Sequence, residues 1–524
     1  MSLHRKIFIA CVAFATVAAG TAPAVAASES ADSVVRPAHS CAELVGDYAV
    51  PDAKTQVTSA VVVPASGAVP EFCDVRGKIE PNIGFQLKLP TQTYRGRYVQ
   101  YGCGGFCGFI TDPVFPKCGP AFGDAAVAAT DDGHQISLEN PFDTTWAKND
   151  QKARDDLFFR APHVLSKVSK HVIGEFYGKG PKKSYFTGCS NGGREALVLA
   201  QRYPHDFDGI IAAAPASYYT GLIAFQAWIA RNAIPDAKVM ILHEAVIKAC
   251  DGLDGLVDKQ IDEPRLCRFD PATLAGQLTD EEIARAKRLY EGPKDHGVRL
   301  YPGGEPYGSE LGWLWWINPR PEFGGSIAGQ LADNGLKHLL YPIGQPHSSL
   351  EQFEFTVREF RRLVPETVKA NALSLDLSDF RRSGGKLIIW HGAADQAIPA
   401  QGTIDYWQRL TGGKQPDWAR LFIVPSISHC EGGDTLTNFD PFRELVSWVE
   451  GGKAPSKVIA EGRDADGNVM RTRPVFPYPL RAKYDGSGSI DDASNFVAAP
   501  GFPTVDRVRW AGEDLYYRPG PVAP

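Results

Sequence analysis

The pentapeptide Gly188-Cys189-Ser190-Asn191-Gly192 limits the folds open to this chain more than any other segment. An apolar run at 184–187 precedes it, and a stretch with helical spacing at 193–203 follows it. A G-x-S-x-G sequence between a strand and a helix places the serine on a sharp turn, with its hydroxyl exposed at the end of a sheet. The pattern predicts that Ser190 is a nucleophile. It also predicts that the backbone N–H of Asn191, at a helix N-terminus, stabilises negative charge on a substrate.

Apolar strands alternate with helical stretches on both sides of this pentapeptide. We expect strands at 97–101, 125–130, 184–187, 209–215, 386–390 and 420–424, and helices at 153–176 and 193–203. This order predicts an α/β fold with a parallel sheet and helices on both faces.

Residues 218–383 interrupt the alternation. They contain four tryptophans, several Gly/Pro turns and no clear strand–helix order. We interpret them as an insertion over the carboxyl ends of the strands, where α/β folds bind their ligands. The tail after residue 453 is rich in turns, and we expect it to pack across the core.

A serine nucleophile needs a base, and the base needs an acid that orients it. Asp395 follows the strand at 386–390 and His429 follows the strand at 420–424, so the chain order is Ser, Asp, His. We predict that Ser190, Asp395 and His429 form a catalytic triad. His391 lies on the same turn as Asp395 and is the nearest rival for the base, but we interpret it as support for that turn.

A second donor for an oxyanion is expected on the loop after an earlier strand. Gly102-Cys103-Gly104-Gly105 follows the strand at 97–101, and its glycines allow close approach of the backbone to a substrate carbonyl. We favour the N–H of Gly104 or Gly105. The alternative is an ordinary glycine-rich turn.

The first 26 residues predict export. Arg5 and Lys6 precede an apolar run from Ile7 to Gly20, and Ala24-Val25-Ala26 resembles a cleavage site, so we assign 1–26 as a signal peptide. No later segment offers about 20 apolar residues for a membrane span. The net charge of −6, spread along the chain, argues against a nucleic-acid partner and against a polybasic membrane anchor.

Nine cysteines remain after the predicted signal peptide, and export predicts that most form disulfides. Cys189 adjoins Ser190 and Cys430 adjoins His429, so a disulfide between them would tie the nucleophile to the base. Two separate buried thiols are the alternative. Since nine is odd, at least one cysteine stays free.

The insertion contains Asp251-Gly252-Leu253-Asp254-Gly255-Leu256-Val257-Asp258, a glycine-containing turn with three carboxylates. Such a turn offers hard oxygen ligands, which suit Ca²⁺. A solvated acidic turn is the other interpretation. Cys250 and Cys267 bracket the segment, and a disulfide between them would close it.

The combination of Cys189-Ser190, Asp395 and His429-Cys430 resembles the signature of the tannase/feruloyl esterase family. Similar segments occur from Tyr101–Gly108 to Arg471–Phe496, so the resemblance spans nearly the whole chain after residue 26. It implies an α/β-hydrolase core at 27–217 and 384–524, with 218–383 as a lid domain.

The same resemblance implies several site details. Structural calcium in the lid would be held by Asp251, Asp254 and Asp258 and by the carbonyls of Leu256 and Gln260. The implied disulfides are Cys41–Cys73, Cys189–Cys430 and Cys250–Cys267. A fourth would join two of Cys103, Cys107 and Cys118, with Cys107–Cys118 favoured.

The resemblance also implies an activity. We expect a periplasmic or secreted serine esterase that acts on aromatic acid esters of feruloyl, coumaroyl or galloyl type, with substrates attached to plant polysaccharide or polyphenol. The lid tryptophans would provide stacking surfaces for aromatic rings, or else form the lid core. Three alternatives are a hydrolase of another aromatic monoester, such as mono(hydroxyethyl) terephthalate, a serine peptidase, and a non-catalytic protein that binds phenolics or polysaccharide.

Overall fold

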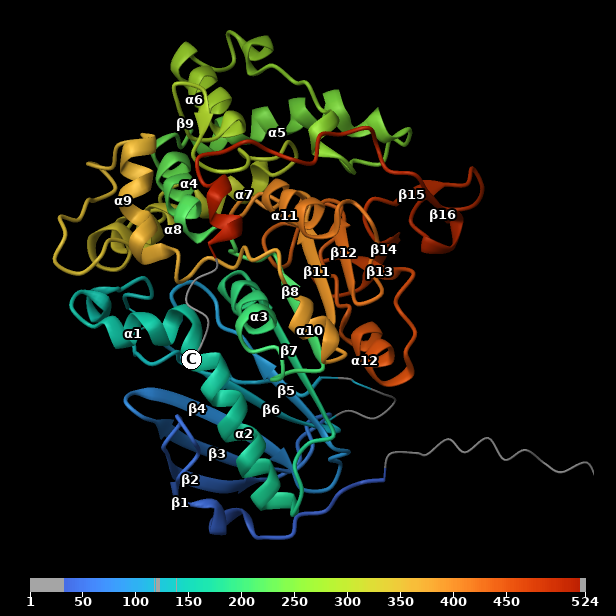
Figure 1. Ribbon diagram of the computed structural model, residues 1–524. Helices are drawn as coiled ribbons and strands as arrows, with labels where there is room; N and C mark the ends of the chain where they lie inside the picture. The colour runs from blue at the N-terminus through green and yellow to red at the C-terminus, as the bar shows by residue number, and fades with distance from the viewer. Residues whose placement is uncertain (1–32, 117, 119–122, 138, 519–524) are drawn as a thin grey trace, which may run out of the picture. The chain divides into compact units, whose positions relative to one another are not determined.

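A ten-stranded sheet organises the computed structural model, which describes residues 33–116, 118, 123–137 and 139–518 (Figure 1). The predicted signal peptide at 1–26 lies outside the described residues. The strand order is β1-β2-β3-β4-β6-β5-β7-β8-β11-β12. The strands are β1 (Gly46–Tyr48), β2 (Thr55–Val63), β3 (Phe72–Ile79), β4 (Ile83–Pro90), β5 (Arg97–Tyr101), β6 (Ala125–Thr130), β7 (Lys183–Cys189), β8 (Gly209–Ala213), β11 (Lys386–Gly392) and β12 (Ala419–Val424).

Six neighbouring strands, β6-β5-β7-β8-β11-β12, pair in parallel, whereas β1 to β4 form an antiparallel meander that joins β6 through β4. The strands expected at 97–101 and 125–130 are confirmed with the same bounds. The antiparallel strands between residues 46 and 90 were not predicted one by one.

Helices cover both faces of the parallel part. The α-helices are α1 (Gln151–Asp155), α2 (Ala161–Tyr177), α3 (Asn191–Arg202), α4 (Tyr219–Arg231), α5 (Asp236–Cys250), α6 (Asp280–Glu291), α7 (Glu310–Trp316), α8 (Ile327–Asn334), α9 (Val357–Thr367), α10 (Ser378–Arg382), α11 (Gln401–Thr411) and α12 (Phe442–Gly451). Short hairpins are formed by β9 (Lys294–Asp295) with β10 (Val298–Arg299), β13 (Val458–Arg463) with β14 (Val469–Val475), and β15 (Arg481–Tyr484) with β16 (Phe496–Ala499).

Alternate residues of one strand enter two different cores. Ala126 and Ala128 of β6 join the core under α2, α3 and α11, while Ala125 and Val127 join the core under α12 and the β13–β14 hairpin. Both faces of the parallel strands are therefore buried, which explains why their sequences are continuous apolar runs instead of alternating patterns.

The helix expected at 153–176 is divided by a π-helical turn at Asp156–Arg160. Pro162 follows this turn and has no N–H to bond the carbonyl of Phe158. The carbonyls of Leu157 and Phe158 instead accept hydrogen bonds from the Arg194 guanidinium, at 2.8 and 2.6 Å. Through Arg194, the irregular turn therefore fixes the position of α3, the helix that begins after Ser190.

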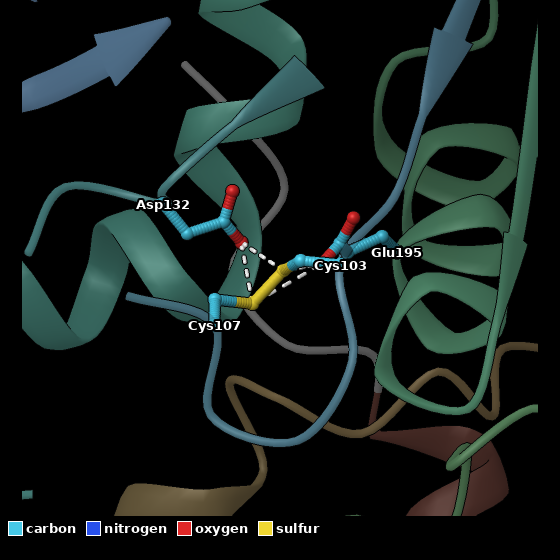
Figure 2. Close-up of side chains that lie close together, drawn as sticks. All are labelled: Cys103, Cys107, Asp132 and Glu195. Atoms are coloured by element: carbon cyan, nitrogen blue, oxygen red, sulfur yellow. Dashed lines mark hydrogen bonds between the residues drawn. A yellow bond between two sulfur atoms is a disulfide. The ribbon is translucent and has the colours of Figure 1, made fainter. Parts of the chain in front are cut away.

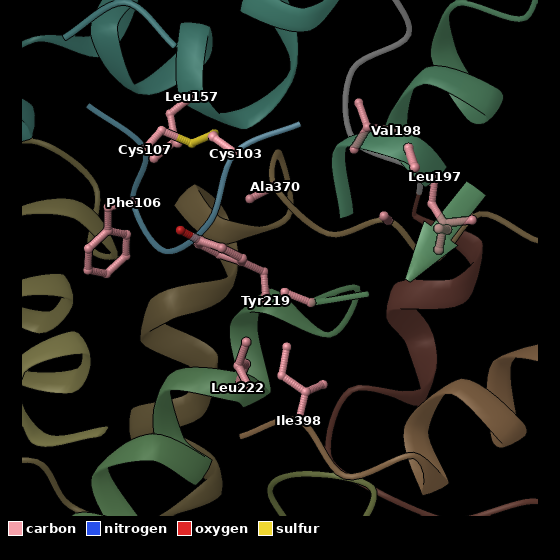
Figure 3. Close-up of a cluster of buried hydrophobic side chains, with 14 of the residues drawn as sticks. Cys103, Phe106, Cys107, Leu157, Leu197, Val198, Tyr219, Leu222, Ala370 and Ile398 are labelled. Atoms are coloured by element: carbon pink, nitrogen blue, oxygen red, sulfur yellow. A yellow bond between two sulfur atoms is a disulfide. The ribbon is translucent and has the colours of Figure 1, made fainter. Parts of the chain in front are cut away.

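Helices α4 to α10 lie between β8 and β11 in sequence, inside the segment expected as an insertion (Figure 1). A buried cluster joins this segment to the core: Tyr219 and Leu222 of α4 belong to the same hydrophobic cluster as Cys103, Cys107 and Leu157 (Figure 3). From Val34 onward the described chain forms one compact unit. The lid boundaries at 218 and 383 stay a prediction.

No helix within the described residues has both the length and the apolar character that a membrane span requires.

Candidate active site

Ser190 occupies a strained turn between β7 and α3. Its φ and ψ are 64° and −119°, outside the regions that L-residues favour. A Cβ on Gly188 would lie 2.6 Å from the carbonyl carbon of Gly192, so the turn accepts no side chain there. The Ser190 N–H donates to Ala213 O on β8 at 3.1 Å, which fixes the turn to the sheet.

Asp395 and His429 form a buried pair on the loops after β11 and β12. His429 Nδ1 lies 2.8 Å from Asp395 Oδ2. The other Asp395 oxygen accepts the backbone N–H groups of Ala397 and Ile398, at 2.8 and 2.7 Å. Burial alone would raise the pKa of Asp395, but His429 and His391 outweigh it and hold that pKa well below the usual range. The carboxylate therefore stays ionised and orients His429 through Nδ1–H.

His391 is fully buried, and both of its ring nitrogens are occupied. Nε2 lies 2.6 Å from Ile398 O and 3.1 Å from Asp395 Oδ2, and Nδ1 lies 2.8 Å from Thr403 Oγ1. A carbonyl can only accept, so Nε2 carries the proton and Nδ1 accepts from the threonine. His391 thus supports the Asp395 turn and has no free nitrogen to act as a base.

A disulfide connects the two halves of the predicted triad. Cys189 precedes Ser190 and Cys430 follows His429, and their Cα atoms lie 5.9 Å apart. The Ser190 hydroxyl forms no hydrogen bond with His429 in the described chain. Proton transfer between them remains a prediction, since such contacts often tighten only around a substrate.

The glycine-rich loop after β5 lies against the start of α3. The Gly102 N–H donates to Thr187 O at 3.0 Å, and a Cβ on Gly192 would lie 3.0 Å from the Gly102 carbonyl carbon. Gly104 and Gly105 have open space on their Cβ sides. The loop therefore adjoins the nucleophile turn, and the roles of Asn191, Gly104 and Gly105 as oxyanion donors stay predictions.

A buried pair of carboxyl groups, from Asp132 and Glu195, flanks the Cys103–Cys107 disulfide of this loop, and sequence analysis missed it (Figure 2). Glu195 Oε1 accepts from the Asn191 amide at 2.7 Å and lies 3.0 Å from Cys103 Sγ, while Asp132 Oδ2 lies 3.4 Å from Cys107 Sγ. Burial raises the pKa of Glu195 to about 7. Burial and then Glu195 raise the pKa of Asp132 well above its usual range.

The four side chains place their ligand atoms within 4.8 Å of one another, close enough to hold a metal ion. However, Cys103 and Cys107 form a disulfide, which removes the thiolates that bind metals.

The favoured Cys107–Cys118 pairing is wrong: Cys118 is buried and free. Cys107 pairs with Cys103 and not with Cys118, because Cys103 and Cys107 lie four residues apart on one tight loop. The structure also contains Cys41–Cys73 and Cys250–Cys267.

A sequence profile described as tannase and feruloyl esterase matches residues 66–499. The chain belongs to this family. It is 31% identical to a mono(2-hydroxyethyl) terephthalate hydrolase of Piscinibacter sakaiensis, over 87% of this chain and 90% of the relative. It is also 31% identical to a probable feruloyl esterase of Arthroderma benhamiae, over 79% and 82%. The protein is therefore a carboxylic-ester hydrolase.

Solved structures show the same fold. Feruloyl esterase B from Aspergillus oryzae superimposes with a TM-score of 0.73 at 23% identity, covering 85% of this chain and 97% of the other. Tannin acyl hydrolase from Aspergillus niger gives a TM-score of 0.66 at 21% identity, covering 85% and 90%. The expected α/β-hydrolase fold is confirmed.

Two tryptophans of the inserted segment lie near His429. The Trp316 ring centroid is 5.4 Å from that of His429, and Trp315 packs edge-on against Trp316 at 5.6 Å. Trp313 is fully buried and donates to Glu305, so it is part of the hydrophobic core. Trp228 donates to Arg288 O and packs on Phe355.

The acidic turn at residues 251–258 folds around the side chain of Asp251. Asp251 Oδ1 accepts from the N–H groups of Asp258 and Gln260, at 3.0 and 3.2 Å. Asp254 accepts from Leu256 N–H at 2.8 Å. These contacts join Asp251 to Asp258 and Gln260, and Asp254 to Leu256. Within the described residues, the carboxylates of Asp251, Asp254 and Asp258 are not close enough together to form a ready metal site, so the calcium ligands stay a prediction.

The chemistry of this turn fits a divalent cation. Asp258 Oδ1 is buried without a hydrogen-bond partner. Burial and the neighbouring carboxylate of Asp262 raise the pKa of Asp254 to about 7, a cost that a bound cation would relieve. Arg473 Nη2, which sequence analysis did not include, already contacts Asp258 Oδ2 at 2.6 Å.

Proposed function

We propose that this esterase hydrolyses esters of aromatic acids through an acyl-enzyme on Ser190. The observation that carries the proposal is the buried Asp395–His429 pair. A disulfide between Cys430, which follows His429, and Cys189, which precedes Ser190, links this pair to the nucleophile turn. This arrangement supplies a base, an acid that orients it and a nucleophile at fixed chain positions.

In the first half of the reaction, Ser190 Oγ attacks the ester carbonyl carbon and His429 Nε2 takes the serine proton. The carbonyl oxygen becomes an oxyanion that accepts from the N–H of Asn191 and of Gly104 or Gly105. Each such donor contributes about 3–4 kcal/mol in comparable sites. His429 then protonates the leaving alcohol, the C–O bond breaks, and the acyl group stays on Ser190.

In the second half, water attacks the acyl carbonyl while His429 takes one of its protons. The tetrahedral intermediate collapses, His429 returns the proton to Ser190, and the free acid leaves. Asp395 stays ionised throughout and stabilises the imidazolium form of His429.

Two observations support an aromatic acyl group. Trp316 lies beside His429 and Trp315 beside Trp316, so flat rings face the region of the base. Relatives named as feruloyl esterases share about 30% identity with the chain. Such rings favour offset or edge-on packing with an aromatic substrate. A substrate attached to plant polysaccharide or polyphenol is part of the proposal.

The mono(2-hydroxyethyl) terephthalate hydrolase relative favours a second candidate, an aromatic monoester with a free carboxylate. A basic residue placed to meet the free carboxylate would favour that substrate. The two candidates therefore differ in how turnover responds to a charged para substituent on the acyl ring. The alternative of a non-catalytic binding protein does not hold, because the chain is an ester hydrolase. Turnover of a synthetic amide would favour the peptidase.

Export and calcium complete the proposal. Four disulfides in the described chain are typical of an oxidising compartment, which supports export of the protein to the periplasm or the medium. Structural Ca²⁺ would be held by Asp251, Asp254 and Asp258 with the carbonyls of Leu256 and Gln260, and it would neutralise carboxylates that burial places together.

The test uses the oxidised protein with calcium present. Hydrolysis of methyl ferulate, methyl gallate, mono(2-hydroxyethyl) terephthalate and an aliphatic ester is measured beside Ser190→Ala. We expect the preferred aromatic ester to react about a hundredfold faster than the aliphatic one, and the variant to be inactive. Faster turnover of the aliphatic ester would overturn the substrate class but keep the nucleophile. Equal activity of the variant would overturn the mechanism.

A further inference from the structure

A cavity of about 670 Å³ lies outside the predicted triad. It is bounded by residues 262–268 and 302–307 of the inserted segment, by 399–401 beside the Asp395 loop, and by 503–505 and 507–509 of the tail. None of Ser190, Asp395 and His429 lines it. Its volume is typical of a small-molecule site.

The C-terminal tail is fixed on both sides of this cavity. Asp506 pairs with Arg265 of the inserted segment at 3.0 Å, and its carbonyl accepts from Gln401 of α11 at 2.7 Å. The Ala511 N–H donates to Arg299 O at 2.8 Å. These contacts therefore fix the tail in place as one wall of the cavity.

Five arginines line the cavity: Arg265, Arg268, Arg299, Arg507 and Arg509. Arg265 is neutralised by Glu263 and Asp506, at 2.6 and 3.0 Å. Across residues 33–116, 118, 123–137 and 139–518, no acidic side chain pairs with the other four. The Arg507 and Arg509 guanidinium groups also form no hydrogen bond within these ranges.

The acidic side chains on the same wall do not balance this charge. Glu263 is already paired with Arg265. Glu305 is buried and accepts from Ser309 and Trp313, and burial raises its pKa above the usual range. Asp262 accepts from Gln260 at 2.6 Å. Even with Asp262, Glu263 and Glu305 all ionised, these three carboxylates are fewer than the five arginines, so the lining keeps an excess of positive charge.

Flat and apolar side chains form the rest of the lining. The rings of Tyr290 and Tyr307 stack with centroids 4.2 Å apart, and both hydroxyls are bonded away, to Glu310 and to Phe269 O. Leu266, Ile404 and Ile423 also line the cavity. A ring with one anionic group matches such a lining better than a fully hydrated inorganic ion, because it satisfies both kinds of surface.

We propose that this cavity is a second binding site that takes an aromatic carboxylate. The identity of the ligand rests on the proposed function, since hydrolysis of an aromatic ester releases an acid of this class. Guanidinium groups from the inserted segment and from the tail hold the carboxylate, and the tyrosine pair supports the ring.

The experiment separates this site from the active site by blocking Ser190 with a sulfonyl fluoride. Binding of ferulate to the blocked enzyme is measured by titration calorimetry at low salt, beside methyl ferulate, inorganic phosphate and galacturonate. We expect one ferulate per chain, with methyl ferulate binding at least about tenfold more weakly. Ferulate binding should also weaken as salt rises.

The test variant is Arg507→Gln with Arg509→Gln, and the matched control is Arg381→Gln with Arg382→Gln on α10, outside the cavity. We expect the test variant to weaken ferulate binding about tenfold or more and the control to leave it unchanged. Both test positions are exposed, so circular dichroism should show unchanged folding.

Several outcomes would overturn the inference. They are no ferulate binding to the blocked enzyme, equal binding to the test variant, equal binding of methyl ferulate, or arginine-dependent binding of phosphate or galacturonate in place of ferulate. Hydrolysis by the unblocked enzyme tests the proposed function separately. A failure there leaves the binding result intact, and a binding failure leaves the hydrolysis result intact.

Discussion

Cys189 and Cys430 are joined by a disulfide across 241 residues of sequence, with their Cα atoms 5.9 Å apart. The bond connects the residue before Ser190 to the residue after His429. In a chain-entropy description, closing so long a loop stabilises the fold by about 5–6 kcal/mol. It also limits how far the nucleophile and the base can separate.

Replacing both of these cysteines, Cys189→Ala with Cys430→Ala, should lower the thermal midpoint and reduce kcat about tenfold or more even well below that midpoint. The control is Cys41→Ala with Cys73→Ala, a disulfide between residues outside the predicted triad. It should lower stability but preserve kcat at low temperature. If the two double variants reduce kcat equally, the Cys189–Cys430 disulfide does not position the triad.

Asp395→Asn should reduce kcat by about 10³–10⁴-fold with a smaller change in KM. The amide keeps the size of the side chain but cannot hold His429 with a proton on Nδ1. Thr403→Val is the matched control, because it removes only the partner of His391 Nδ1. We expect a loss below about tenfold for that control. Comparable losses in steady-state assays would argue against Asp395 as the orienting acid.

Glu195→Gln should flatten the pH dependence of stability. The folded-state pKa of Glu195 is raised from 4.5 to about 7, so the folded chain binds more protons than the unfolded chain between these values. The free energy of unfolding of the wild type should therefore fall as pH rises from 5 to 8, by a few kcal/mol at most. Denaturant unfolding at both pH values measures this.

In Glu195→Gln, the free energy of unfolding should fall less steeply with pH than in the wild type. Part of the decline should remain, because the pKa of Asp132 is also raised. The exposed Glu354→Gln is the control and should retain the wild-type dependence. An unchanged slope in Glu195→Gln would show that this carboxyl does not titrate in the proposed range.

Chelation should lower the thermal midpoint of the wild type, and added Ca²⁺ should restore it. Loss of the cation leaves the carboxylates of the acidic turn close together without compensation. Asp251→Asn with Asp254→Asn should melt at a lower temperature than the calcium-loaded wild type and should no longer respond to Ca²⁺. Scanning calorimetry with and without chelator is the measurement. A calcium response that survives in the variant would place the ion elsewhere.

Trp316→Leu should raise KM for an aromatic ester more than for an aliphatic one, by about threefold to tenfold. The ring lies beside His429, and leucine keeps apolar character without a flat surface. Trp228→Leu is the control, because that indole packs against Phe355. A uniform rise in KM for both esters would indicate a general effect on the lid.

Local sequence determined the elements that carry the chemistry. The strand–turn–helix around Ser190, the strands before Asp395 and His429, and the continuous apolar runs of a sheet buried on both faces all depend on residues close together in the chain. Side-chain period and glycine placement specify such features without tertiary information.

Only the tertiary structure decided what packs behind those elements. Asp132 and Glu195 are 63 positions apart and meet beside Cys103 and Cys107 because α3 packs on the sheet in which β6 is a strand. The contact of Arg473 with Asp258 in the acidic turn likewise depends on residues far apart in the chain, 215 positions from one another. Burial and electrostatic pairing act through space, so a linear pattern can nominate the nucleophile, acid and base but cannot specify the groups that surround them.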